Sequence, residues 1–74
     1  MQYDYSKLLG RIVEKVGTQG RFARQMNLSE RTISLKLNGK IGWKQSEIAD
    51  ACKILGISDR DISTYFFTLK VQNN

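Results

Sequence analysis

The sequence contains no histidine, no proline and one cysteine, and these scarcities exclude several kinds of site. Without histidine, and with Cys52 as the single thiol, the chain has too few ligands for a zinc finger or a catalytic zinc site. One cysteine also rules out an intramolecular disulfide, which fits a reducing cytoplasm. We therefore expect neither a metal nor another cofactor.

Long apolar runs and catalytic motifs are also missing. No apolar run reaches the roughly 18 residues that read as a membrane-spanning helix, and residues 1–4 do not resemble a signal peptide. Asp59 and Asp61 resemble the solvated first turn of a helix rather than a catalytic pair. A chain of 74 residues leaves little room for a substrate pocket. We expect one non-enzymatic domain, residues 1–74, with no membrane contact and no small-molecule substrate.

Acidic residues are scarce in the first two thirds of the chain. The formal net charge is +5. Residues 1–48 hold nine Lys and Arg against four acids, whereas residues 49–74 hold three of each. This asymmetry is typical of a protein that turns one face toward a polyanion, although a merely basic surface explains the charge equally well.

Apolar residues recur at helical spacing and predict five helices in an all-α fold. The expected helices cover residues 5–16, 19–26, 30–38 and 44–55, with a fifth that begins after Ser58. Thr18 and Ser29 are placed to cap the second and third helices, and Asn27 occupies a position that calls for a positive φ. The connection between these two helices is so short that their axes must cross steeply.

The C-terminal tail, residues 67–74, has a different pattern. Residues 67–72 alternate apolar and polar side chains, as a half-buried strand does. A lone strand has no ladder partner inside an all-helical domain. We expect the tail either to pair with a second copy of the chain or, as is commoner, to drape over the helices.

The segment 18–40 carries the functional pattern. Leu28, Ile33 and Leu37 are expected to point inward, whereas Arg31, Ser34, Leu35 and Asn38 share the outer face. An outward helix of this kind, flanked by Gln19, Lys40 and Lys44, has the layout of a reader of the DNA major groove.

These residues resemble the helix-turn-helix of the lambda-repressor-like superfamily, here residues 18–39. The whole chain is similar to small Cro-type regulators of Gram-positive temperate phages, some of which act as modulators of repression. The resemblance implies a compact five-helix DNA-binding domain. Lys36 stands where the superfamily keeps an apolar residue, so either the third helix is slightly rotated or Lys36 lays its stem on the core and reaches out.

The resemblance also implies roles for individual residues. Those that would face base edges are Ser29, Arg31, Ser34 and Leu35. Those that would contact phosphates are Gln19, Asn38, Lys40 and Lys44. Arg31 suits a bidentate contact to guanine, whereas Glu30 is expected to complement the helix dipole rather than to read cytosine.

Two functions fit these observations. The main interpretation is a Cro-like regulator of the lytic/lysogenic switch that binds double-stranded operator DNA, normally as a homodimer. The alternative is an antirepressor that binds the phage lysogeny repressor and blocks or alters its DNA binding. Its interface would use the apolar side chains that we expect to be exposed: Leu35, Tyr65, Phe67 and Leu69. Both interpretations place the protein in the cytoplasm of a bacterial host.

Overall fold

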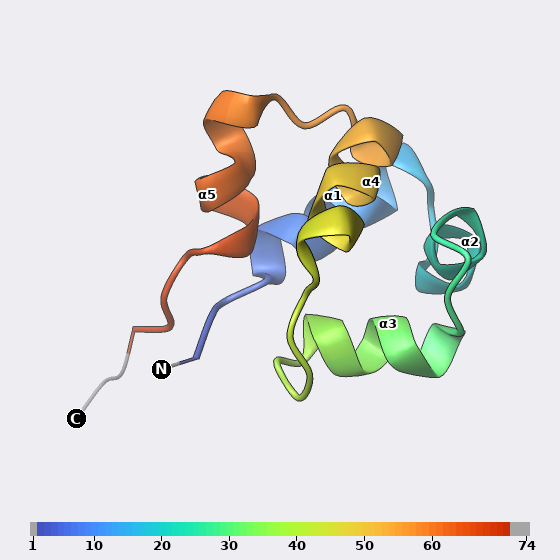
Figure 1. Ribbon diagram of the computed structural model, residues 1–74, viewed down its shortest axis with the longest axis horizontal. Helices are drawn as coiled ribbons and strands as arrows, with labels where there is room; N and C mark the ends of the chain where they lie inside the picture. Colours follow the sequence, from blue (N-terminus) through green and yellow to red (C-terminus); the bar gives the residue numbers. More distant parts are fainter. Residues whose placement is uncertain (1, 72–74) are drawn as a thin grey trace.

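The computed structural model describes residues 2–71 and folds them into helices (Figure 1). The elements are α1 (Ser6–Lys15), α2 (Gln19–Gln25), α3 (Glu30–Leu37), α4 (Gln45–Leu55) and α5 (Ile62–Phe66), the last preceded by a 3₁₀ turn at Asp59–Asp61. The predicted all-α fold with five helices is confirmed, and the first four helices end within one residue of their expected limits. None of the helices formed by residues 2–71 is long and apolar enough to cross a membrane.

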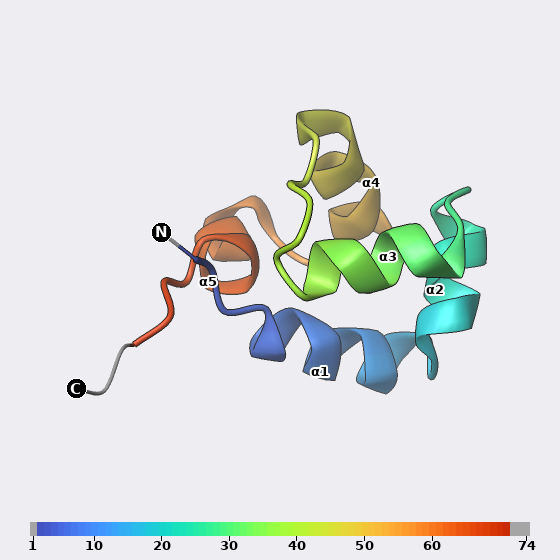
Figure 2. The same ribbon diagram turned by 90° about the horizontal axis from the view of Figure 1, so that it is seen from below.

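Helix α1 is the centre of the arrangement, because it packs against α2, α4 and α5. Helix α3 is held mainly by α2, which stands across its N-terminal end. Figure 2 shows α3 lying across the front of the molecule, with α1 on one side and α4 on the other. One side of α3 therefore remains open to solvent or to a partner.

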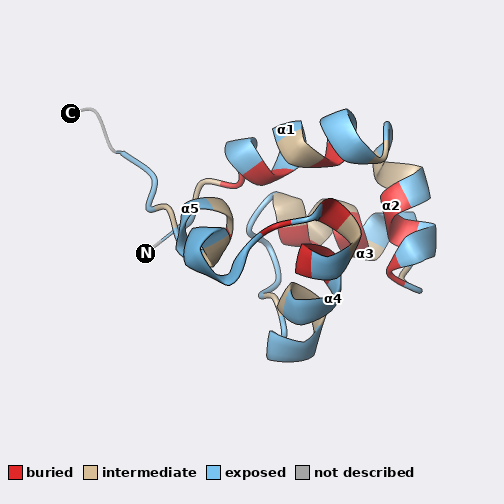
Figure 3. Ribbon diagram, turned by 90° about the horizontal axis from the view of Figure 1, so that it is seen from above, coloured by how far each residue is buried: buried red, intermediate tan, exposed pale blue. Residues whose placement is uncertain are grey.

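The core lies between these helices, and its residues come from all five of them (Figure 3). The largest fully buried side chains are Leu8, Ile12, Phe22, Ile33, Leu55 and Phe66. Cys52 is buried among them, as a small apolar residue would be. The rings of Trp43 and Phe66 pack edge to face, with their centroids 5.2 Å apart, so Trp43 anchors the start of α4 against α5.

The connection between α2 and α3 follows the local sequence closely. Asn27 has a φ of 58°, in the left-handed region that asparagine tolerates better than most residues. The hydroxyl oxygens of Thr18 and Ser29 accept hydrogen bonds from the backbone N–H groups of Arg21 and Thr32, which caps the two helices as predicted.

Lys36 departs from both sequence-based expectations. Its side chain is buried together with its ammonium group instead of reaching out to solvent. The Nζ atom donates a hydrogen bond of 2.8 Å to the carbonyl oxygen of Gly42 and lies 2.7 Å from a carboxylate oxygen of Glu47. Burial is tolerable because the charge is both paired and hydrogen-bonded.

The tail also differs from its prediction, because it has a ladder partner within the chain. Tyr3 and Leu69 form an antiparallel bridge, flanked by hydrogen bonds from Asp4 N–H to Thr68 and from Lys70 N–H to Gln2. We call residues 2–4 and 68–70 the terminal ribbon. Residues 72–74 of the predicted tail lie outside the described residues.

Candidate functional site

The outer side of α3 carries most of the residues that the sequence assigned to base reading. Ser29, Arg31 and Asn38 are exposed, as is Glu30, whereas Ser34 is half-buried. We call these five residues the α3 face. Leu35 is not the exposed apolar residue that we expected, because it is half-buried within α3, where its carbonyl oxygen accepts hydrogen bonds from the backbone N–H groups of Lys40 and Ile41 in the next loop.

Two polar side chains of the α3 face, those of Ser29 and Asn38, are already hydrogen-bonded to residues of α3. Ser29 caps α3, and its hydroxyl group also donates to the side-chain oxygen of Thr32 at 2.8 Å. The side-chain amide of Asn38 donates to the carbonyl oxygen of Ser34 at 2.8 Å. Arg31 and Glu30 thus provide the charges of this face.

The residues expected to contact phosphates do not all lie together in the structure. Gln19, at the start of α2, and Asn38, after α3, line one shallow hollow of ≈ 240 Å³ together with Lys70. Lys40 lines a neighbouring hollow of ≈ 280 Å³, in the loop between α3 and α4. Lys44 precedes α4, is exposed and lines neither hollow.

Two of the nine cations in residues 1–48 are committed to internal contacts. Lys36 is paired with Glu47 inside the protein. Arg11 donates hydrogen bonds to the carbonyl oxygens of Leu55 and Gly56, where it caps the C-terminal end of α4. Fewer than nine cations are therefore available to a polyanion, although the Lys36–Glu47 pair leaves the net charge of residues 1–48 unchanged.

Glu47 shows how this internal pairing is stabilised. Burial by itself would raise the pKa of Glu47, but hydrogen bonds from the Lys36 side chain and the Lys44 backbone, with the positive charge of Lys36, lower the pKa below its ordinary value of 4.5. The carboxylate therefore stays ionised at neutral pH.

An exposed apolar cluster lies on the terminal ribbon and beside it. Tyr3, Phe67 and Leu69 are 36%, 48% and 47% exposed, and the rings of Tyr3 and Phe67 meet edge to face with centroids 5.7 Å apart. We call these three residues the terminal patch. The terminal patch contains two of the interface residues that were expected from sequence, Phe67 and Leu69. Tyr65 is instead half-buried and lines a hollow against α1.

The terminal patch is continuous with the loop that follows α3. Tyr3 and Phe67 line the same hollow as Lys40 and Ile41, and Ile41 is itself 41% exposed. Sequence reasoning missed Tyr3 and Ile41 as surface residues of this region. The alternation of residues 67–72 was the available signal, but it did not show that residues 2–4 lie beside them.

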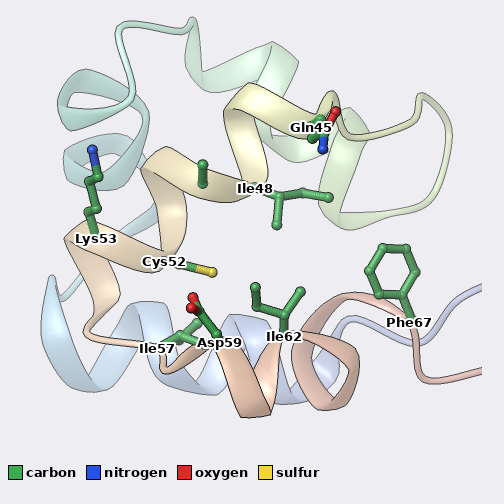
Figure 4. Close-up of a pocket in the computed structure, with 9 residues that line it drawn as sticks. Gln45, Ile48, Cys52, Lys53, Ile57, Asp59, Ile62 and Phe67 are labelled. Atoms are coloured by element: carbon green, nitrogen blue, oxygen red, sulfur yellow. The ribbon is translucent and has the colours of Figure 1, made fainter.

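A larger groove of ≈ 520 Å³ lies between α4 and the segment that runs from Ile57 through α5 to Phe67 (Figure 4). The Cys52 side chain points toward it, with the Asp59 carboxylate nearby. Burial, and to a lesser extent the negative charge of Asp59, raises the pKa of the Cys52 thiol. The thiol therefore stays protonated, so the groove contains no activated nucleophile. Among residues 2–71, no three His, Cys, Asp or Glu side chains come together as metal ligands would.

Comparison with known proteins gave two findings. The family described as "Protein of unknown function (DUF739)" matches residues 1–69. The chain is also similar to the solution structure of the modulator of repression (MOR) of the temperate bacteriophage TP901-1 from Lactococcus lactis, with 57% sequence identity, a TM-score of 0.80 and 97% of each chain covered. No curated protein matches the chain.

Proposed function

The chain belongs to the DUF739 family, and from this premise we propose that it is a modulator of repression, which binds the phage lysogeny repressor and blocks or alters its DNA binding. The observation that carries this proposal is the identity of 57% over 97% of both chains to a phage modulator of repression. The proposal favours the antirepressor interpretation over the Cro-like one. It implies a non-enzymatic protein that acts in the cytoplasm of a bacterial host.

The terminal patch is the surface that best suits a protein partner. Tyr3, Phe67 and Leu69 expose apolar area side by side, and exposed apolar clusters often mark interfaces. The neighbouring Ile41 extends the apolar area, and Lys40 supplies a polar rim. Interfaces commonly combine an apolar centre with a charged periphery in this way.

Operator binding is the second candidate function, and Arg31 is the observation in its favour. Arg31 is exposed near the N-terminal end of α3, where a groove-reading helix contacts base edges. Autonomous operator reading normally needs a homodimer, because one such helix reads too few base pairs. A complex with the repressor has no such requirement.

A pair of titrations at physiological salt tests the proposal. Labelled operator DNA of the phage switch and the cognate lysogeny repressor are each titrated with this protein. A tight complex with the repressor, together with weak or unselective DNA binding, is the expected result. Tight and sequence-selective DNA binding with little repressor binding would instead establish a Cro-like regulator.

Substitutions then locate the interface. Leu69→Lys is expected to weaken the repressor complex by about tenfold or more, the loss typical of an interface hot spot. Val13→Lys is the matched control, because Val13 is an exposed apolar residue on α1, outside the terminal patch. The affinity of Leu35→Lys for the repressor tests separately whether α3 takes part in the complex. The affinity of Arg31→Ala for operator and unrelated DNA tests whether operator discrimination depends on Arg31.

A further inference from the structure

The carboxylate group of Glu30 lies over the first turn of α2. A Cβ atom placed on Gly20 would be 3.4 Å from one carboxylate oxygen of Glu30 and 3.6 Å from the other. Gly20 is the second residue of α2, and Glu30 is the first residue of α3. The side chain therefore spans the place where both helices begin.

Glu30 is the only acid among residues 18–40, which contain five Lys and Arg. Its negative charge is placed where two helix N-termini bring backbone N–H groups and positive partial charge together. In helix-turn-helix docking, the first helix crosses the DNA backbone and the N-terminal end of the second meets the bases. A duplex docked in this way would bring its phosphates toward the Glu30 carboxylate.

We infer that Glu30 is a specificity determinant that disfavours duplex DNA on the surface formed by α2 and α3. The carboxylate neutralises the local field that would attract a phosphate, and it repels phosphates that approach. A protein partner can satisfy the same carboxylate with a hydrogen-bond donor, which a phosphate backbone does not provide. The inference rests on the proposed function. It explains how a basic protein can bind the repressor without itself binding the operator DNA.

The opposite role for Glu30 makes an opposite prediction. If its carboxylate accepted a hydrogen bond from a cytosine amino group, removal of the charge would weaken binding to sites with cytosine at that position. If it disfavours phosphates, the same change strengthens binding to every duplex. The sign of the effect and its dependence on sequence therefore separate the two roles.

The test uses Glu30→Gln, which keeps the size of the side chain and removes its charge. Binding to an operator duplex and to a scrambled duplex is measured by fluorescence anisotropy at several salt concentrations. We expect tighter binding to both duplexes by a similar factor of roughly two to five, the range for one exposed charge pair, with the gain shrinking as salt rises. Glu30→Asp keeps the charge and is expected to leave the affinities near those of the unmodified protein.

Asp61→Asn is the matched control, because it removes one exposed negative charge before α5, away from α2 and α3. If Asp61→Asn and Glu30→Gln increased the affinity for DNA equally, net charge alone would explain the effect, and the inference would be overturned. Unchanged DNA binding by Glu30→Gln, or weaker binding to the operator alone, would also overturn it. These outcomes compare variants on DNA only, so they stand apart from the repressor titration that tests the proposed function.

Discussion

The ammonium group of Lys36 lies 2.7 Å from a carboxylate oxygen of Glu47, and this ion pair joins α3 to α4 inside the protein. The two side chains are 4% and 13% exposed. Lys36 also hydrogen-bonds the carbonyl oxygen of Gly42, so one side chain fixes both the helix and the loop that leaves it. Because α3 otherwise packs mainly on α2, the pair is a second anchor for the α3 face.

Replacement of Lys36 by Met is expected to lower the free energy of unfolding by about 3–5 kcal/mol, because it leaves the Glu47 carboxylate buried without its counter-charge. Urea denaturation followed by Trp43 fluorescence measures the loss. The double variant Lys36→Met/Glu47→Gln should recover part of the stability, since no unpaired charge remains. Lys40→Met, on the exposed loop, is the control and should change stability by less than about 0.5 kcal/mol. Equal losses for Lys36→Met and Lys40→Met would contradict the anchoring role.

The same pair predicts how stability depends on pH. Burial opposes ionisation of Glu47, but its hydrogen bonds and the charge of Lys36 lower its pKa below 4.5 in the folded protein. A carboxyl group with a lowered pKa stabilises the fold above its unfolded pKa, and the stability is lost as the pH falls through the folded value. We expect the free energy of unfolding to drop between about pH 5 and pH 3. Glu47→Gln should flatten this part of the curve, and an equally steep curve would exclude Glu47 as the cause.

Two glycines should respond in opposite directions to replacement by alanine. Gly10 lies within α1, and a Cβ atom there meets nothing within 4 Å. Gly10→Ala should therefore add about 0.5–1 kcal/mol of stability. Gly56 ends α4 with a φ of 65°, so Gly56→Ala should cost about 1 kcal/mol or more. Thermal denaturation of both variants measures the two changes in stability. A lower stability of Gly10→Ala would show that α1 needs this glycine for a reason other than backbone freedom.

Ser29 has a capping role that can be separated from contact with a partner. Ser29→Ala removes the acceptor for the Thr32 N–H group and should cost about 1 kcal/mol of stability. Ser29→Asp retains a capping oxygen and should keep most of that stability. If partner binding follows stability across both variants, Ser29 acts through the helix cap. If Ser29→Asp is stable but fails to bind, the loss arises at the interface, from the missing hydroxyl group or the added charge, and not from the helix cap.

Features that depend on neighbours in the chain were predictable from sequence. The caps at Thr18 and Ser29 and the left-handed Asn27 are fixed within a few residues, so local chemistry determines them. The position of Lys36 was not predictable, because its burial depends on the carboxylate of Glu47 in another helix. The half-burial of Leu35 likewise depends on how the loop after α3 folds back, which helical periodicity does not describe.

The terminal patch was predictable only in part, since exposed Phe67 and Leu69 were expected but their neighbour Tyr3 was not. Its residues come from both ends of the chain, and residues 2–4 are too few to display a period of two. The alternating residues 67–72 showed an unsatisfied strand edge without showing what pairs with it. Position in the fold, rather than residue type, brings Tyr3 next to Phe67.

The bridge between Tyr3 and Leu69 offers a place to tie the fold into a covalent ring. The flanking hydrogen bonds make these two residues a non-hydrogen-bonded antiparallel pair, in which Cα atoms lie about 4.5 Å apart, a spacing that a disulfide can span. Cysteines at both positions would enclose all five helices in one loop. In the chain-entropy account such a long loop stabilises a protein by about 4 kcal/mol. An oxidant could then lock the two ends together, and a reductant could free them.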